Sequence, residues 1–406
     1  MRRFPLAAIA GWLAVLWFAL GAPRTAYADE PDVFSDEVIL DAQPAARATA
    51  STFSLKSFRA RMAYLAQHGN GYQSQAGPLT GPGSERVIIV EPQIEAVITQ
   101  GERMVHRVWV PLDVVSAASP DAIDQHRVDV MSQASRITNA GTFDWTGTYK
   151  LDRQTEVSTR GAFHLESNYR SWTGGIGFAR SLADDNATLS ASVNEVADWF
   201  DIYSIDGHRQ GHSSRSALNV NVGLTQLLSP TTVAYMGYGG TVQTGTLGNT
   251  WNSVPFGSST RVSEIIPDER VRNAFVGRIA QYLPWHAAVK GYARLYFDDW
   301  GALAGTGEVT LDQRIVGSLV VSGTYRLHEQ RGVAFFTTNA LDSPRLYRTA
   351  DSDLQTFAAQ TVGTRLSFDV PGPHAPDVHV DFGYDHYFRT NSLTIDTYLC
   401  GAGLVF

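Results

Sequence analysis

The sequence predicts an all-β fold: a transmembrane antiparallel outer-membrane β-barrel of 14 or 16 strands, preceded by a cleaved signal peptide. Three observations lead to this prediction. The chain ends in an alternating strand whose last residue is Phe406, it begins with an export signal, and its long loops all fall on one side of the strand order. Soluble proteins rarely leave an apolar strand at a free terminus, whereas a closed barrel pairs its last strand with its first.

The C-terminal strand alternates in character. One face carries Phe406, Leu404, Ala402, Cys400 and Tyr398, and the other carries Gly403, Gly401 and Thr397. The pattern resembles the C-terminal sorting signal of bacterial outer-membrane proteins, with Phe406, Leu404 and Tyr398 as its apolar positions. This resemblance implies recognition of the last strand by the barrel-assembly machinery.

The N-terminus has the features of a secretory signal peptide. Arg2 and Arg3 precede an apolar stretch at residues 6–22, and Ala26-Tyr27-Ala28 follows as a small-x-small exit. The strongly apolar part is shorter than the roughly 20 residues that span a membrane as a helix. We therefore expect residues 1–28 to be removed, with a retained membrane anchor as the alternative.

Composition limits the possible partners and cofactors. With residues 1–28 removed, 29 basic residues face 40 acidic ones, so the net charge is −11. This balance argues against a nucleic-acid partner, because phosphate binding needs clustered Lys and Arg. Cys400 is the single cysteine, so no internal disulfide and no multi-cysteine metal site can form. No cofactor, metal or catalytic residue is expected.

Residues 87–406 divide into segments of the length that a tilted membrane strand needs. In the clearest one, Val378, Val380 and Phe382 share an apolar face, while His379 and Asp381 share the other. Period-two alternation with one apolar face is the signal of a half-buried strand. The segments are 87–99, 103–115, 142–151, 155–167, 169–181, 187–199, 215–228, 232–244, 271–283, 286–298, 303–315, 317–329, 354–369, 377–388 and 392–406.

The connections between these segments sort by length. With Phe406 on the periplasmic side, the periplasmic connections are all short: 100–102, 152–154, 182–186, 229–231, 283–286, 314–317 and 370–376. The long ones all fall on the opposite side: 116–141, 200–214, 245–270 and 330–353. Short periplasmic turns and longer extracellular loops are typical of outer-membrane barrels. The sequence thus predicts a protein in the outer membrane of a Gram-negative bacterium, in contact with its lipid.

Fifteen strands cannot close a barrel whose two ends lie on the same side, since that needs an even number. Either one segment is not a strand, or residues 51–67 supply another. Leu55, Phe58, Met62 and Leu65 recur at helical spacing, which favours an amphipathic helix there. Residues 29–86 are accordingly expected to form a flexible or amphipathic N-terminal segment, a plug or a first strand.

Several motifs resemble an uncharacterised outer-membrane family, domain of unknown function 3570. They are Asn168-Tyr169-Arg170-Ser171, Asn186-Ala187-Thr188-Leu189-Ser190, Leu224-Thr225-Gln226-Leu227-Leu228-Ser229-Pro230-Thr231, Pro267-Asp268-Glu269-Arg270 and Tyr296-Phe297-Asp298-Asp299-Trp300-Gly301. The isoleucine that usually follows the last motif is Ala302 here. The resemblance implies a barrel whose partners include a small lipoprotein or periplasmic redox proteins. It implies no established activity.

The polar face of each strand should line the lumen. On this assignment the lumen collects Arg272, Arg278, Lys290, Arg294, Asp298, Glu308, Arg326, Arg365, Asp381 and Asp385. These charges either select small hydrophilic or charged solutes, or only pair across the interior and hold the barrel together. A channel is the leading functional hypothesis. A non-conducting scaffold for periplasmic or surface partners is the alternative, and a barrel-embedded hydrolase is the third.

Three further motifs have ordinary structural interpretations. Asp298-Asp299 and Asp385-His386 resemble the paired acids and histidine of outer-membrane proteases, but strand parity points His386 toward lipid. His208 and His212 have the spacing of a metal pair, but two glycines between Asp206 and His212 favour a loop. The aromatic girdle at the membrane boundaries is expected to hold Trp109, Trp145, Trp172, Trp285 and Trp300.

Overall fold

A computed structural model describes residues 53–69, 87–117, 138–204, 208–248, 252–257, 260–342, 346–370 and 376–406. The expected signal peptide at residues 1–28, and the chain from there to residue 52, lie outside these described residues. Among the residues described, no helix is both long and apolar enough to cross a membrane.

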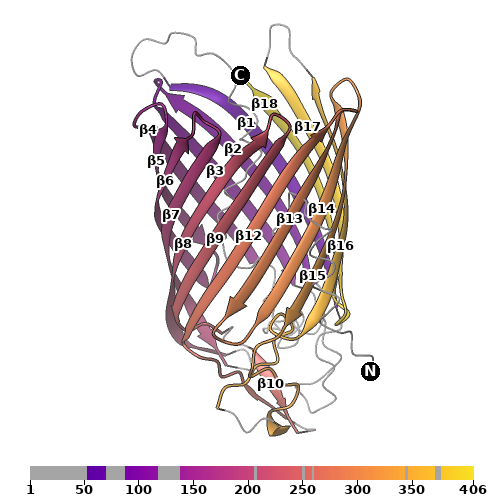
Figure 1. Ribbon diagram of the computed structural model, residues 1–406. Coiled ribbons are helices and arrows are strands. Elements are labelled where there is room, and N and C mark those ends of the chain that lie inside the picture. The colour runs from indigo at the N-terminus through magenta and orange to yellow at the C-terminus, as the bar shows by residue number, and fades with distance from the viewer. Residues whose placement is uncertain are drawn as a thin grey trace.

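Sixteen strands form one closed antiparallel barrel (Figure 1). They are β1 (Phe53–His68), β2 (Val87–Gln100), β3 (Met104–Ala117), β4 (Thr138–Lys150), β5 (Thr155–Leu165), β6 (Tyr169–Leu182), β7 (Ala187–Tyr203), β8 (Arg209–Ser229), β9 (Thr232–Gly245), β12 (Glu269–Leu283), β13 (Ala287–Asp298), β14 (Leu303–Val316), β15 (Leu319–Arg331), β16 (Phe357–Val370), β17 (Asp377–Arg389) and β18 (Thr394–Val405). Each strand pairs with its neighbours in the chain, β9 pairs with β12, and β18 closes the barrel on β1.

The fifteen predicted strands are all present, and β1 is the sixteenth. The helical interpretation of residues 51–67 is therefore wrong. Phe58 and Met62 are four residues apart, a spacing that fits one face of a strand as well as one face of a helix. Both side chains are exposed on the outer face of β1, whereas Leu65 lies in the opposite register. Because both edges of β1 are paired, with β18 and β2, the strand has no free edge.

One expected long loop is short. β7 continues to Tyr203 and β8 begins at Arg209, so residues 204–208 alone connect them. The extension is stabilised by Asp201, whose carboxylate lies 2.7 Å from Arg209 Nε and 2.8 Å from His212 Nδ1. The glycines in this stretch predict a loop. Instead, the ion pairs of Asp201 accompany an extended backbone pairing of β7 with β8, beyond the apolar part of the barrel. His212, considered for a metal pair, therefore lies within β8.

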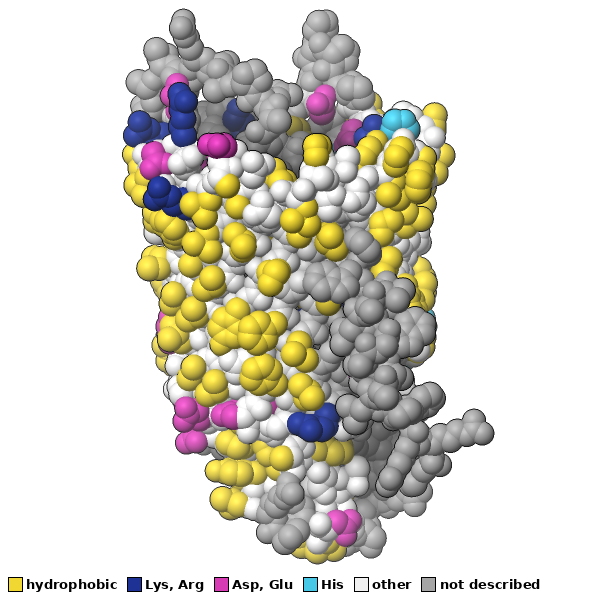
Figure 2. Space-filling model, viewed as in Figure 1, with side chains coloured by type: hydrophobic (Ala, Val, Ile, Leu, Met, Phe, Trp, Pro, Cys, Tyr) yellow, Lys and Arg dark blue, Asp and Glu magenta, His cyan; other side chains and the backbone are white. Residues whose placement is uncertain are grey.

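The outer wall is apolar. Figure 2 shows hydrophobic side chains spread over the visible face of the barrel, with most of its charged side chains near the two ends. Met236 on β9 is 67% exposed and Ile176 on β6 is 65% exposed, as expected for apolar side chains that face lipid. The opposite register is polar and buried, as with Glu308 and Asp385. The chain thus has an outer-membrane β-barrel fold.

The tryptophans divide between the wall and other positions. Trp172 on β6 and Trp199 on β7 are exposed on the outer wall, whereas Trp285 is exposed in the turn between β12 and β13. Trp300 is instead only 5% exposed and packs against Val333 and Phe335, beyond the end of β13. Trp109 lies on the inner face, opposite Glu95 on β2. A position near a strand end therefore does not by itself predict a place in the girdle.

The two ends of the barrel differ. β1 begins and β18 ends at the end of the barrel that carries the short turns, which we call the turn end; the opposite end is the loop end. At the loop end, residues 246–268 include a hairpin of β10 (Ser253–Phe256) and β11 (Thr260–Ser263). Residues 332–356 include a short 3₁₀ helix, η2 (Ala340–Asp342), and pair with the first loop at Ile265 and Arg348. The described parts of these two loops form the cap (Figure 1).

Candidate functional site

The candidate site is the inner face of the barrel wall. The strand register places all ten predicted lumen residues on the face opposite the exposed apolar side chains. They are Arg272 and Arg278 on β12, Lys290, Arg294 and Asp298 on β13, Glu308 on β14, Arg326 on β15, Arg365 on β16, and Asp381 and Asp385 on β17.

Opposite charges on neighbouring strands pair across this face. Lys290 Nζ on β13 lies 2.7 Å from Asp312 Oδ2 on β14. Arg326 pairs with Glu308, whose side chain is only 1% exposed. A carboxylate so deeply buried needs a paired cation, because the desolvation of a lone charge is costly. These pairs therefore stabilise the wall as well as giving it a charged inner surface.

Further ion pairs were not singled out from the sequence. Arg160 Nη2 lies 2.6 Å from Asp144 Oδ2, and Arg107 Nη2 lies 2.7 Å from Glu95 Oε2. The same register also holds Arg59, Arg61, Lys150, Glu156, Asp198, Arg215, Arg270 and Arg389. Lys150, Glu156, Asp198 and Arg215 lie within segments predicted as strands, so the period of two could have identified them, whereas Arg270 and Arg389 lie just outside the predicted bounds. Arg59 and Arg61 were hidden by the helical interpretation of β1.

One inner-face ion pair crosses the line of barrel closure. Arg61 Nε on β1 lies 3.6 Å from Asp381 Oδ1 on β17, although β18 lies between the two strands. The residue beneath them on β18 is Gly401, which is paired with both. A Cβ at Gly401 would lie 2.5 Å from Asp381 Oδ1 and 2.9 Å from Arg61 Cγ. We call Arg61, Gly401 and Asp381 the closure seam.

The Asp-Asp-Trp-Gly motif forms a corner at the loop end of β13. Asp298 accepts hydrogen bonds from Arg270 Nε at 2.9 Å, from the Tyr296 hydroxyl at 2.7 Å and from the Ala302 amide at 2.9 Å. Its side chain is fully buried. The Arg270 guanidinium lies 4.3 Å from the centre of the Trp300 ring, within the range of a cation–π contact.

The neighbouring residues of this corner also contact backbone. Asp299 accepts the Val271 amide at 2.9 Å, and Trp300 donates its indole N–H to the Glu269 carbonyl at 2.8 Å. Gly301 has a φ of +89°, a conformation that side-chain-bearing residues rarely adopt. The motif that carries the family resemblance thus ties β12 to β13 where the cap begins.

The second acidic motif is divided between the two faces of the wall. Asp385 faces inward, with Oδ2 3.8 Å from Arg365 Nη2. His386 occupies the outward register and lies 2.8 Å from Asp396 Oδ1 on β18. Three strands separate Asp385 on β17 from Asp298 on β13. The structure therefore does not bring the two motifs together.

The cap has an apolar core and a buried acidic pair. Trp300, Val333 and Phe335 form one cluster of buried side chains with Ala302. In the cap, the Asn252 amide lies 3.4 Å from Glu264 Oε2 and 3.5 Å from Asp351 Oδ2. Burial raises the pKa of Glu264 to about 7. Burial, and then the negative charges of Asp353 and Glu264, raise the pKa of the Asp351 carboxyl well above its usual range.

These raised pKa values predict a pH-dependent cap. Carboxyls that bind protons more tightly in the packed cap than in the open loops stabilise packing at low pH. This contribution is lost as pH rises from the ordinary carboxyl range, about 4, through the raised values. Amide hydrogens of residues 260–268 should exchange more slowly at about pH 5 than at about pH 8, after correction for intrinsic exchange. Glu264→Gln, which stays neutral, should flatten the profile. Equal protection across this range in the unmodified protein would contradict the assignment.

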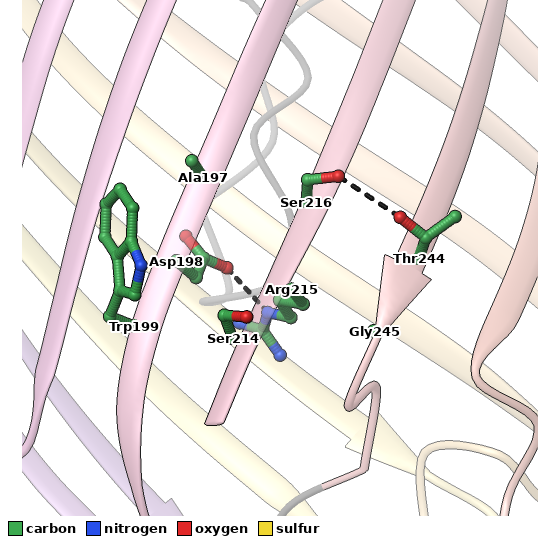
Figure 3. Close-up of a pocket in the computed structure, with 8 residues that line it drawn as sticks. All are labelled: Ala197, Asp198, Trp199, Ser214, Arg215, Ser216, Thr244 and Gly245. Carbon is green, nitrogen blue, oxygen red and sulfur yellow. Dashed lines mark hydrogen bonds and ion pairs between the residues drawn. The ribbon is translucent and has the colours of Figure 1, made fainter. Parts of the chain in front are cut away.

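A separate pocket of about 280 Å³ lies at the loop ends of β7, β8 and β9 (Figure 3). The side chains that line it from the outward register include Trp199, Ser216 and Thr244. The Ser216 Oγ and Thr244 Oγ1 atoms are 3.2 Å apart. Asp198 and Arg215 pair at 2.6 Å in the inward register. Because Trp199 is exposed on the outer wall, this pocket is a shallow depression in the outer surface of the barrel and not part of the lumen.

The chain is similar to one protein family and to several solved structures. A family model described as "Protein of unknown function (DUF3570)" matches residues 41–404. A search of curated proteins gave no match. Among solved structures, the chain is similar to the siderophore receptor PirA from Pseudomonas aeruginosa, with 11% identity and a TM-score of 0.42 over 88% of this chain and 62% of that one. The chain thus spans less than two thirds of that receptor.

Two porin-sized structures are matched over nearly their whole length. A BenF-like porin from Pseudomonas fluorescens Pf-5 has 8% identity and a TM-score of 0.44, over 87% of this chain and 99% of that one. OccD3 (OpdP) from Pseudomonas aeruginosa has 8% identity and a TM-score of 0.43, over 89% and 94%. These similarities concern the fold.

Proposed function

We propose that this chain, which belongs to the DUF3570 family of proteins of unknown function, is an outer-membrane channel that conducts small polar solutes. The observation that carries the proposal is the charged inner face of a closed barrel of 16 strands. Barrels of about eight strands can be filled by their own side chains, whereas those of about 16 leave room for water. Paired Lys, Arg, Asp and Glu side chains give such a space a hydrophilic wall.

The proposed location is the outer membrane of a Gram-negative bacterium, reached by export on a signal peptide cleaved after Ala28. The apolar outer wall and the alternation of the last strand support this proposal. On this orientation the turn end faces the periplasm and the cap faces the exterior.

We further infer that the paired acids serve the fold and not catalysis. Asp298 is fully buried against Arg270, and Asp299 accepts a backbone amide. Asp298 is thus held by a buried ion pair, and Asp299 ties the backbone of β12 to the end of β13; both are structural roles. His386, on the outward register, is paired with Asp396.

Single-channel recording tests the conduction proposal. The protein, recovered from the outer membrane of a bacterial host and inserted into planar bilayers, should give stable conductance steps. The control is the same preparation after boiling, which should give none. A folded barrel, recognised by its altered gel mobility before and after boiling, that gives no steps would overturn the proposal.

A further inference from the structure

We propose that the cap contains a calcium site at the base of the β10–β11 hairpin, where a bound Ca²⁺ ties the two loops of the cap together (Figure 1). The ligands from this chain are side-chain oxygens of three residues: Asn252, Glu264 and Asp351. Calcium takes carboxylate and amide oxygens as ligands and completes its shell with water. The inference goes beyond the proposed channel function and does not depend on conduction.

The fold brings these three residues together from the two loops. Asn252 immediately precedes β10 and Glu264 immediately follows β11, and the Glu264 amide donates to the Asn252 carbonyl at 3.2 Å. Asp351 comes from the second loop, which pairs with the first through two backbone hydrogen bonds between Ile265 and Arg348. Asn252 and Asp351 are 99 residues apart in the chain, so no sequence motif marks the cluster.

The two carboxylates meet at one side chain. The Asn252 Nδ2 atom lies 3.4 Å from Glu264 Oε2 and 3.5 Å from Asp351 Oδ2, and Asp351 is only 8% exposed. Among the described residues neither carboxylate forms an ion pair, since Arg389, which acts on Asp351 electrostatically, is paired with Asp353. Burial of two like charges without a counter-ion is costly. One divalent cation would balance both.

The amide oxygen of Asn252 points independently to a ligand. The residue is only 3% exposed, yet within the described chain its Oδ1 atom accepts no hydrogen bond. The Nδ2 contacts, at 3.4 and 3.5 Å, are longer than the usual N–H···O distance of about 3 Å. A half-turn of the amide about the Cβ–Cγ bond would place Oδ1 toward both carboxylates. Three oxygens facing one another are favourable only with a cation between them.

Neighbouring residues hold both carboxylates in place. Thr349 is fully buried and donates its hydroxyl to Glu264 Oε2, and Asp351 Oδ1 accepts the Asp353 amide at 2.9 Å. A Cβ at Gly248 would lie 2.7 Å from Glu264 Oε1, so a side chain there would displace this oxygen. The ligands are therefore positioned before an ion binds, which lowers the ordering cost of binding.

The ligand set predicts a weak site. Among the described residues, no group of three or more His, Cys, Asp or Glu side chains is arranged to hold a metal. The proposed site therefore has two carboxylates and relies on amide and water oxygens for the rest of its shell. Calcium sites of extracellular modules have dissociation constants of about 10⁻⁴–10⁻³ M. On the proposed orientation the cap faces the exterior, so a site of this strength would respond to external calcium.

Calcium and protons would stabilise the cap by the same means. At pH 5 protons neutralise Glu264 and Asp351, whereas at pH 8 a bound cation would balance their charge. The pH dependence predicted for the cap therefore applies to protein kept in a chelator, and calcium should remove it.

Hydrogen exchange of the full-length protein, recovered from the outer membrane into detergent micelles, tests the site at about pH 8. Amides of residues 260–268 and 347–353 should exchange about 6- to 50-fold more slowly in about 5 mM Ca²⁺ than in EDTA, because a ligand lowers the open population by the factor 1 + [L]/Kd. NaCl at the same ionic strength should not slow them. Because this readout is local, calcium bound elsewhere does not contribute.

Two variants locate the ion. Asp351→Asn keeps the size of the side chain but removes one charge, so it should lose most of the calcium response. Glu264→Gln should do the same and serves if Asp351→Asn does not fold, as judged by gel mobility. The matched control is Asp342→Asn, which alters an exposed acid of η2 in the same cap and should respond as the unmodified protein does.

The outcomes separate this site from the channel proposal, which conductance tests. Slowing that calcium alone produces, that Asp351→Asn loses and that Asp342→Asn keeps, would support the site. Equal slowing in NaCl, a full calcium response in Asp351→Asn, or no response from a folded barrel would each overturn it. None of these results would affect the channel proposal.

Discussion

Replacing Asp298 with alanine should destabilise the folded barrel by about 3–5 kcal/mol, the usual cost of removing one member of a buried ion pair. The Asp298 side chain is fully buried and that of Arg270 is 9% exposed, so the guanidinium would remain in a low-dielectric site without its counter-ion. The variant would also lose the acceptor for the Tyr296 hydroxyl and the Ala302 amide. Urea-induced unfolding in detergent micelles measures the change.

The matched control is Asp312→Ala. This carboxylate also pairs with an inner-face cation, Lys290, but the two side chains are 17% and 24% exposed, so water can solvate the remaining charge. Its loss should be about 1 kcal/mol or less, as for solvent-accessible pairs. Adding Arg270→Met to Asp298→Ala should restore part of the stability, because the buried charge is then removed. Equal losses for Asp298→Ala and Asp312→Ala would contradict the role assigned to burial.

Replacing Gly401 with leucine should strongly reduce the yield of closed barrel. The new side chain would occupy the space through which Arg61 reaches Asp381, with its Cβ within 3.0 Å of both. Inserting atoms into a filled space typically costs about 1–3 kcal/mol, and here the clash falls where the first and last strands must pair. The fraction of protein with the altered gel mobility of a folded barrel before boiling is the measurement.

Gly305→Leu provides the control for this substitution. Gly305 lies in the outward register of β14, where a Cβ would meet nothing within 4 Å. Leucine there adds apolar surface to a wall that already faces lipid and should leave the folded fraction unchanged. A similar loss from both substitutions would mean that the cost comes from losing glycine in a strand and not from the closure seam.

Strand periodicity and loop length predicted most of the fold. The alternation in β17 is clear because membrane and lumen impose opposite polarities on adjacent residues. The same argument failed for β1, where Phe58 and Met62 satisfy helical and strand spacing alike. It also failed beyond the membrane: the pairing of Asp201 with Arg209 extends β7 and β8 where no apolar face marks a strand.

The candidate site was predicted only in part. Strand parity predicts on which face of the barrel wall each charged residue lies. Its ion-pair partner depends on the register between strands, which a single sequence does not reveal. Arg278 could thus be placed inside the barrel, whereas its contact with the Tyr235 ring depends on the register of β9 and β12. Trp300 shows the opposite problem, since its position at a strand end suggested lipid contact, but the cap buries it.

The closure seam also has a consequence for synthesis and quality control. Arg61 is made near the start of the barrel, and Gly401 and Asp381 are made at its end, so the contact can form only in a fully translated chain. A product that stops before β18 retains two unpaired strand edges, which favour aggregation or proteolysis. Only chains that contain the last strand can therefore form a closed and stable barrel.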